Sequence, residues 1–396
     1  MTVSNKAASE QMRVKHFTTL LVPPFLAVLY AHILLFIAAL RSGLSHDFFN
    51  AHLWVRWDSG HYLRIAQVGY SHVYWCKQTP SIPVFSWCGD AAWMPLYPWL
   101  ISIVSRIGVT PEQGAVVISA VFAYLLMVAV WYLIGPSWDV RSLCCLALAA
   151  AFPGMVYFNA VFPISLVAFF STVFLILLIK KRYFLAGLAG VVAIWSYSAS
   201  LVLVPISFVV ILLYDRGSRL WEWVKRTSAT TGTMLVGVLA LLASFKLWTG
   251  DWFATAKIQS NYGSGLNNPV FIFIQSLSGG TRVEFALQNR NPGYLFHAPK
   301  EQSVFIFVLL VSICVVALRE KPIQRSSIII VIYSLAVWLL LLLQGPQLSR
   351  YRSEALLIPC VALVRKLPWV FQVGAVAAAS FIAVDLAQLF YTSLII

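Results

Sequence analysis

Apolar runs long enough to cross a lipid bilayer recur along the whole chain, and they limit its fold more than any other feature. A helix that spans a bilayer needs about 20 predominantly apolar residues. We place eleven such segments, of which the fifth and the tenth are short and are either half-spans or re-entrant segments. They cover residues 17–40, 112–135, 142–160, 162–179, 184–198, 199–214, 228–248, 303–318, 327–344, 354–364 and 370–392.

The composition excludes a soluble protein. Only 11% of the residues are charged and 60% are hydrophobic, whereas soluble domains average about 25% charged residues. The net charge of +14 would suit a nucleic acid, but the basic residues fall in short clusters and form no long basic face. We therefore expect an all-α polytopic membrane protein, with residues 1–396 as one integral membrane domain in contact with lipid and without a nucleic-acid partner.

The distribution of Lys and Arg predicts the orientation in the membrane. Short cytoplasmic loops carry an excess of basic residues. With the N-terminus inside, every cytoplasmic segment contains at least one Lys or Arg, and the segment 180–182 consists of three. The first apolar run is too long for a signal-peptide core and lacks a clear cleavage site, so we expect it to remain as an anchor. The prediction is an N-in, C-out topology.

Three polar segments then lie on the outer side: the long loops 41–111 and 249–302, and the shorter segment 344–354. Most loops of a polytopic protein only connect helices, so three substantial segments on one face indicate a working surface there. In the first loop, Cys76 and Cys88 bracket a segment that contains two prolines. In an oxidising compartment we expect them to form a disulfide; two free thiols are the alternative.

The stretch 54–70, WVRWDSGHYLRIAQVGY, predicts a short amphipathic helix in the membrane interface. Its apolar positions share one helical face, and its polar positions share the other. Asp58 falls at or just before the first helical residue, and Gly69 falls where the helix would stop. A structural role for Asp58 is an N-cap that accepts hydrogen bonds from free backbone amides. That role is compatible with catalysis, because a capping carboxylate is held in a fixed orientation.

These residues carry a resemblance to a known family. R-W-D at 56–58, the following G-H-Y-L-x-I-A-x-x-G-Y, and W-M-P-L-Y-P at 93–98 resemble the PIG-V family of mannosyltransferases. Weaker matches lie at 152–170, 250–263 and 349–360. The resemblance implies a GT-C membrane glycosyltransferase with a polyprenyl-phosphate-linked sugar as its donor. With the apolar runs and the 54–70 pattern, the predicted fold is GT-C-type, with about eleven transmembrane helices and interfacial helices in the first outer loop.

The chain departs from the family pattern at two places. Residues 162–165, FPIS, lie where the family usually has Ser-Glu, and residues 195–200, WSYSAS, lie where it has a motif with arginine. Two other functions therefore stay open. One is a catalytically inactive GT-C-like subunit that binds lipid or supports assembly. The other, which the eleven spans suit in number, is a transporter of lipid or solute, although no internal repeat of the kind that transporters use is visible.

Transfer of a sugar from a lipid phosphate with inversion needs one carboxylate base, because the phosphate leaves as an anion. The second carboxylate of glycosidases has no counterpart here. Asp58 is the candidate base, since it lies on the outer side at the family's Trp-Asp position. The weaker candidates are Asp47 and Asp90 in less structured parts of the loop, Asp251 after a helix end, and Glu284 in a polar loop.

The departing phosphate needs cations. Arg350 and Arg352 in SRYRSE are the first candidates, because two guanidinium groups lie there at headgroup level. Arg56 and Arg64 are the next, because they neighbour Asp58 in the sequence. His61 would contact the base or the acceptor. The alternative for each arginine is a contact with lipid headgroups, and for His61 an ordinary polar contact.

The remaining predictions concern cofactors, partners and location. The histidines show no metal-ligand spacing, so we expect neither a metal nor another cofactor. The acceptor is a glycan, lipid or protein hydroxyl. We expect a bacterial inner membrane with a periplasmic active face, or the ER membrane if the chain is eukaryotic. Asp385, a carboxylate in the last apolar run, is a functional candidate by its position, and its role stays undecided.

Overall fold

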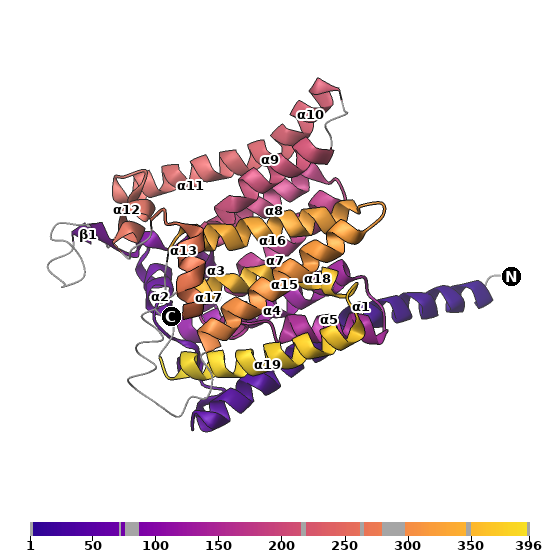
Figure 1. The fold of residues 1–396 in the computed structure, drawn as a ribbon. Coiled ribbons are helices and arrows are strands. Elements are labelled where there is room, and N and C mark those ends of the chain that lie inside the picture. The colour runs from indigo at the N-terminus through magenta and orange to yellow at the C-terminus, as the bar shows by residue number, and fades with distance from the viewer. Residues whose placement is uncertain are drawn as a thin grey trace.

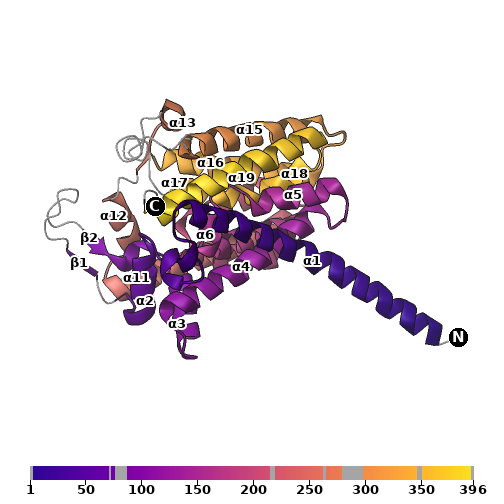
Figure 2. The ribbon, with the colours of Figure 1, turned by 90° about the horizontal axis from the view of Figure 1, so that it is seen from below.

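The computed structural model describes residues 3–70, 73–75, 87–214, 219–261, 265–278, 298–345 and 350–393. These residues form a bundle of α-helices with a single two-stranded sheet at one end (Figures 1 and 2). The helices are α1 (Val3–Arg41), α2 (Ser59–Val68), α3 (Leu96–Ser105), α4 (Pro111–Ile134), α5 (Val140–Ala150), α6 (Val156–Asn159), α7 (Ile164–Ile179), α8 (Tyr183–Ser196), α9 (Leu203–Tyr214), α10 (Leu220–Thr227), α11 (Thr233–Thr249), α12 (Ala254–Ser260), α13 (Pro269–Ser278), α15 (Ala298–Arg319), α16 (Arg325–Leu343), α17 (Arg350–Ser353), α18 (Val361–Val364) and α19 (Trp369–Tyr391).

The all-α membrane fold expected from the apolar runs is confirmed. Each of the eleven predicted segments coincides with helical structure. Among the described residues, six helical stretches are long and apolar enough to cross a bilayer: Thr18–Arg41, Pro111–Ile134, Leu220–Thr249, Pro299–Arg319, Arg325–Leu343 and Trp369–Tyr391. The predicted short segment 354–364 is a 3₁₀ helix, η6 (Glu354–Cys360), followed by α18.

Helix α1 shows how the bundle meets its solvent. Phe25, Leu29 and Ile33 follow one another at intervals of four residues and are about half exposed. Leu35 and Ala38 on the other side of the same helix are fully buried. Large apolar side chains on an exposed face suit lipid rather than water. One face of this helix is therefore apolar because it meets lipid, and the other because it packs inside the bundle.

Close packing of α8 on α11 depends on glycine. A Cβ atom added to Gly190 would lie 2.2 Å from Met234 Sδ, and one added to Gly237 would lie 2.6 Å from Val191 Cγ2. Small residues at such crossings let helix backbones approach one another closely in a membrane. Gly187 makes a similar approach to the backbone of Ala229.

Ion pairs join loops at one end of the bundle, from which α10 and the start of α1 project (Figure 1). Arg365 Nη2 lies 3.0 Å from Asp139 Oδ2, and Lys366 pairs with Glu320. Lys366 Nζ also donates to Ser327 Oγ over 3.0 Å. Three of the loops that we expect in the cytoplasm are therefore held together, although their side of the membrane stays a prediction.

The three segments predicted on the outer side meet at the opposite end, near β1 (Val73–Trp75), α12 and the end of α19 (Figure 1). Thr255 of the second segment donates to the Ala91 carbonyl of the first over 2.7 Å. The third segment pairs with the first through Arg352 and Asp58. These contacts bring polar groups from distant parts of the sequence to one end of the bundle.

Strand β1 pairs antiparallel with β2 (Trp87–Gly89), and this register places Tyr74 opposite Cys88. Cys88 is disulfide-bonded, but Cys76 lies outside the described residues, so the predicted Cys76–Cys88 bridge stays a prediction. The cysteines in the apolar runs are free thiols, as expected from their surroundings: Cys144, Cys145, Cys314 and Cys360.

Candidate active site

The amphipathic helix predicted after Asp58 is α2. Tyr62 and Ile65 are buried on one face, and the helix stops at Gly69, which adopts a φ of +70° and donates to the Ile65 carbonyl. Asp58 occupies the N-cap position, but its side chain accepts no capping hydrogen bond. The capping role considered for Asp58 is therefore wrong, and its carboxylate is directed to another partner.

That partner is Arg352. Nη1 of Arg352 lies 2.8 Å from Oδ2 of Asp58. The arginine side chain is only 5% exposed, while the aspartate is 22% exposed, so the pair is closed on one side and open on the other. Trp57, directly before the aspartate, has a φ of +47°. This left-handed backbone costs free energy in a bulky residue and is typical of functional sites.

Aromatic rings form the walls around Arg352. Its Cζ lies 4.9 Å from the centre of the Phe162 ring and 5.9 Å from that of Tyr197. The Tyr197 hydroxyl is 2.8 Å from Ser353 Oγ, which fixes the ring beside the guanidinium. The two segments in which the chain departs from the PIG-V pattern, 162–165 and 195–200, thus each supply an aromatic neighbour to the arginine.

Arg350 belongs to a different cluster. It donates through Nη1 to Ser276 Oγ over 2.7 Å and through Nη2 to Ser303 Oγ over 2.9 Å. Its Nε lies 3.4 Å from Glu354 Oε1, and Glu354 also accepts a hydrogen bond from Gln302. All of these groups are buried. The structure therefore does not bring Arg350 to the Asp58 carboxylate, although only one residue separates it from Arg352.

Arg56 donates hydrogen bonds to backbone carbonyl groups. It donates to the carbonyl oxygens of His52 and Val55 over 2.9 and 2.7 Å, and to that of Tyr391 over 3.3 Å. These contacts fix the turn before Asp58 to the last residue of α19. Arg56 therefore orients the chain that carries the carboxylate, and its terminal nitrogens are committed to carbonyl groups.

His61 and Arg64 meet at Asp90, which is 2% exposed. His61 Nδ1 lies 2.7 Å from Asp90 Oδ1, and Arg64 donates through Nε to Asp90 Oδ2 over 2.6 Å. The His61 ring stacks on Trp93 with 3.5 Å between the ring centres. Burial raises the pKa of the Asp90 carboxyl, but the hydrogen bonds from His61 and Arg64 outweigh burial and hold the pKa below its ordinary value.

The expectation that Asp90 lies in a less structured part of the loop is wrong. Asp90 begins the 3₁₀ helix Asp90–Ala92 directly after β2. A signal was present in the sequence, because Asp90 precedes the Trp93–Pro98 motif by three residues. Because that motif packs on α2 through Trp93 and Tyr97, it also carries the carboxylate to His61.

The other acidic candidates that the structure describes pair with other cations. Asp385 of α19 is 3.4 Å from Arg41 at the end of α1. Asp251 pairs with Lys257 on α12, and Glu284 lies outside the described residues. Within the described part of the chain, no three His, Cys, Asp or Glu side chains gather as metal ligands would; the absence of a metal requirement stays a prediction.

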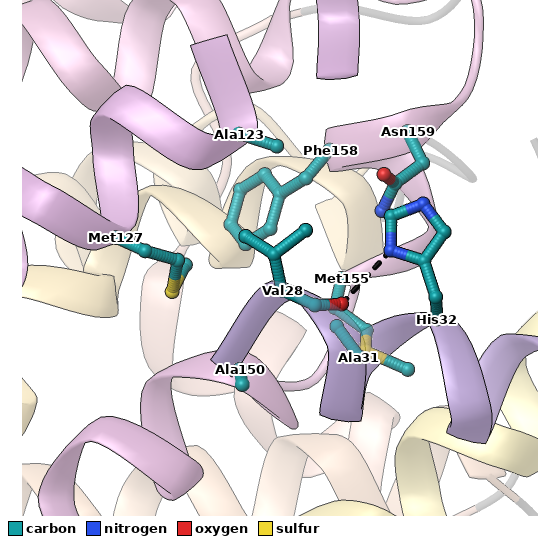
Figure 3. A pocket seen from close by; sticks show the side chains of 9 residues that line it. All are labelled: Val28, Ala31, His32, Ala123, Met127, Ala150, Met155, Phe158 and Asn159. Carbon is teal, nitrogen blue, oxygen red and sulfur yellow. Dashed lines mark hydrogen bonds between the residues drawn. The ribbon is translucent and has the colours of Figure 1, made fainter. Parts of the chain in front are cut away.

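A cavity lies between α1, α4 and α6. Figure 3 shows the Asn159 side chain facing the His32 ring, with Phe158 and Met155 beside them. His32 Nδ1 is 2.9 Å from the Val28 carbonyl of its own helix. Phe158 and Asn159 face this cavity, whereas Tyr157, the preceding residue of α6, packs against Phe162. This short helix therefore lies between the cavity and the surroundings of Arg352.

Solved structures share this fold. The aminoarabinose transferase ArnT of Cupriavidus metallidurans, solved with bound undecaprenyl phosphate, matches with a TM-score of 0.56 at 14% identity, over 88% of this chain and 62% of its own. The oligosaccharyltransferase of Archaeoglobus fulgidus, solved without ligand, matches with a TM-score of 0.52 at 16% identity, over 91% of this chain and 56% of its own. No family model and no curated protein matches the sequence.

The fold is therefore that of the GT-C membrane glycosyltransferases. This chain spans about three fifths of the length of the solved relatives that it matches. The GT-C fold implied by the first motif is confirmed, whereas membership in the PIG-V family stays a prediction.

Proposed function

We propose that this protein transfers a mannosyl or related hexosyl unit from a polyprenyl-phosphate-linked donor to an acceptor hydroxyl, on the non-cytoplasmic face of the membrane. The observation that carries the proposal is the Asp58–Arg352 pair, a partly open carboxylate 2.8 Å from a buried guanidinium. A base and a cation for phosphate are the two groups that an inverting displacement requires, and here they lie side by side in a GT-C fold.

The reaction is one displacement. The acceptor O–H gives its proton to Asp58 while its oxygen forms a bond to the anomeric carbon. The bond from that carbon to the phosphate oxygen breaks, and polyprenyl phosphate leaves with the electron pair. Arg352 stabilises the negative charge that develops on the phosphate, which is the kind of electrostatic contribution that dominates many enzymatic rates. The ArnT structure with bound undecaprenyl phosphate supports a lipid phosphate of this class as the donor.

The experiment measures transfer of labelled mannose from polyprenyl-phosphate mannose in membranes that contain the wild-type chain, the Asp58→Asn variant or the Asp251→Asn variant. Asp251 is the matched control, because it is also predicted on the outer side but pairs with Lys257 rather than with Arg352. We expect Asp58→Asn to abolish transfer and Asp251→Asn to retain it, with both variants folded. Substantial turnover by a folded Asp58→Asn variant excludes Asp58 as the base.

The second candidate is a catalytically inactive subunit that binds a lipid phosphate. The aromatic neighbours Phe162 and Tyr197 favour it, because they come from the segments where the PIG-V pattern has a carboxylate and an arginine. Such a subunit would bind polyprenyl phosphate but show no transfer with any donor sugar, and Asp58→Asn would then leave its binding intact.

A further inference from the structure

Tyr157 of α6 directly precedes Phe158 and Asn159, which line the cavity. Its hydroxyl has no role in the reaction proposed above. Its side chain is fully buried, and among the described residues its hydroxyl oxygen has no hydrogen-bond partner. Buried polar groups are nearly always hydrogen-bonded, because leaving one without a partner costs free energy. Such a group in a native structure therefore needs an explanation.

Its position supplies one. The Tyr157 ring packs edge-on against Phe162 with 5.4 Å between the ring centres, and Phe162 is also the ring that lies 4.9 Å from Cζ of Arg352. Arg352 and Asp58 are the charged groups whose fields act on the Tyr157 hydroxyl. The phenol thus lies beside the proposed centre and shares an aromatic wall with its cation.

Arg352 also has an unused donor. Its Nε is buried and has no hydrogen-bond partner among the described residues. An arginine N–H only donates, whereas a tyrosine hydroxyl donates or accepts. The Tyr157 hydroxyl and Arg352 Nε are thus two buried donors beside one centre, and neither has an acceptor among the described residues. A ligand with several acceptor oxygens would satisfy both. A phosphate group does so, and hydrogen bonds to a charged acceptor are stronger than neutral ones.

We propose that Tyr157 donates its hydroxyl hydrogen to a phosphate oxygen of the lipid-linked donor, beside Arg352. This inference rests on the proposed function and adds a residue for phosphate recognition to it. The phosphate replaces the Asp58 carboxylate at the Arg352 guanidinium. Tyr157 then donates a further hydrogen bond to the phosphate. Asp58 becomes free to accept the acceptor's proton only when the donor is in place.

The test compares Tyr157→Phe with Tyr333→Phe. The Tyr333 hydroxyl is also buried, but it donates to the Leu356 carbonyl over 2.8 Å. The dissociation constant of undecaprenyl phosphate is measured for both purified variants in detergent, together with their melting temperatures. Undecaprenol, which has the same chain without the phosphate, serves as the second ligand.

We expect Tyr157→Phe to weaken undecaprenyl phosphate binding by about tenfold or more, with undecaprenol binding unchanged and the melting temperature unchanged or higher. Tyr333→Phe should lower the melting temperature and leave both affinities unchanged. Equal phosphate affinity in wild type and Tyr157→Phe overturns the inference, as does a wild-type chain that does not bind the phosphate. Because no sugar is transferred in this assay, a failure of the proposed catalysis leaves its result intact.

Discussion

Arg350 and Arg352 lie two residues apart on the same short helix and have very different surroundings. The terminal nitrogens of Arg350 are occupied by serines of α13 and α15, and its Nε faces Glu354. Arg352 faces one carboxylate and lies between two aromatic rings. The Nε of each arginine is buried without a hydrogen-bond partner among the described residues, so the two differ at their terminal nitrogens. The terminal nitrogens of Arg350 are satisfied by buried serines of the protein, which gives this arginine a structural role. Arg352 faces a partly exposed carboxylate instead, so it is the better placed of the two to meet a ligand.

The first way to test this contrast is to remove Arg350. We expect Arg350→Met to destabilise the fold by about 3–5 kcal/mol, because it leaves the Glu354 carboxylate buried without its partner. Thermal unfolding in detergent measures the loss, and the double variant with Glu354→Gln should recover much of it. Transfer per folded molecule should stay near wild type. A stable Arg350→Met variant with weakened donor binding would return Arg350 to the substrate site.

Removal of Arg352 should show the opposite behaviour. We expect Arg352→Ala to lower the transfer rate by about 10²–10³-fold, the size found when one preorganised donor to a developing anion is removed. Donor affinity should fall with it. The assay is transfer of labelled sugar at equal amounts of folded protein, and a rate within a few-fold of wild type would contradict the assignment.

The Asp90 cluster should give a smaller effect, because Asp90 holds His61 and Arg64, which are only secondary candidates for contact with the substrates. We expect Asp90→Asn to slow transfer by about tenfold, equivalent to about 1.4 kcal/mol. The low pKa of the Asp90 carboxyl also predicts that the stability of the protein depends on pH. A carboxylate whose pKa is lowered in the folded state stabilises the protein above its unfolded pKa of about 3.9, and loses this contribution as the pH falls through the folded pKa.

The stability difference between wild type and Asp90→Asn should therefore be fully present at neutral pH and shrink below about pH 4. Unfolding of both proteins across this range in detergent measures it. Asp251→Asn is not a suitable control here, because the pKa of Asp251 is also lowered, by its hydrogen bond with Lys257. A difference that grows as the pH falls would show that Asp90 is not charged in the folded protein.

The smallest effect is expected at Tyr197, whose hydroxyl already has Ser353 as its partner. Tyr197→Phe should cost about 1 kcal/mol of stability, the net value of one hydrogen bond. The ring stays beside Arg352, so transfer should change by less than about threefold. A large loss of transfer at unchanged stability would mean that this hydroxyl contacts the substrate.

Much of this architecture follows from local pattern. Apolar runs predict the helices because each span must satisfy its backbone internally and meet lipid outside, and the alternation of polar and apolar positions predicts α2 with Asp58 at its start. The ion pairs could not be predicted in the same way. Arg350 and Arg352 have almost the same sequence surroundings, and their separate roles depend on Ser276, Ser303 and Asp58, which only the packed bundle brings near. Asp90 was ranked low although its place just before the Trp93–Pro98 motif is a local signal; its contacts with His61 and Arg64 depend on the packing of that motif on α2.

The pair between Asp58 and Arg352 also has a consequence for how the protein is made. Its carboxylate precedes the second predicted span, and its guanidinium follows all but the last two. A chain that enters the membrane from its N-terminus must insert almost every helix before these two groups can meet. The centre is thus completed late in biogenesis, and a partly inserted chain contains Asp58 before Arg352 is available to pair with it.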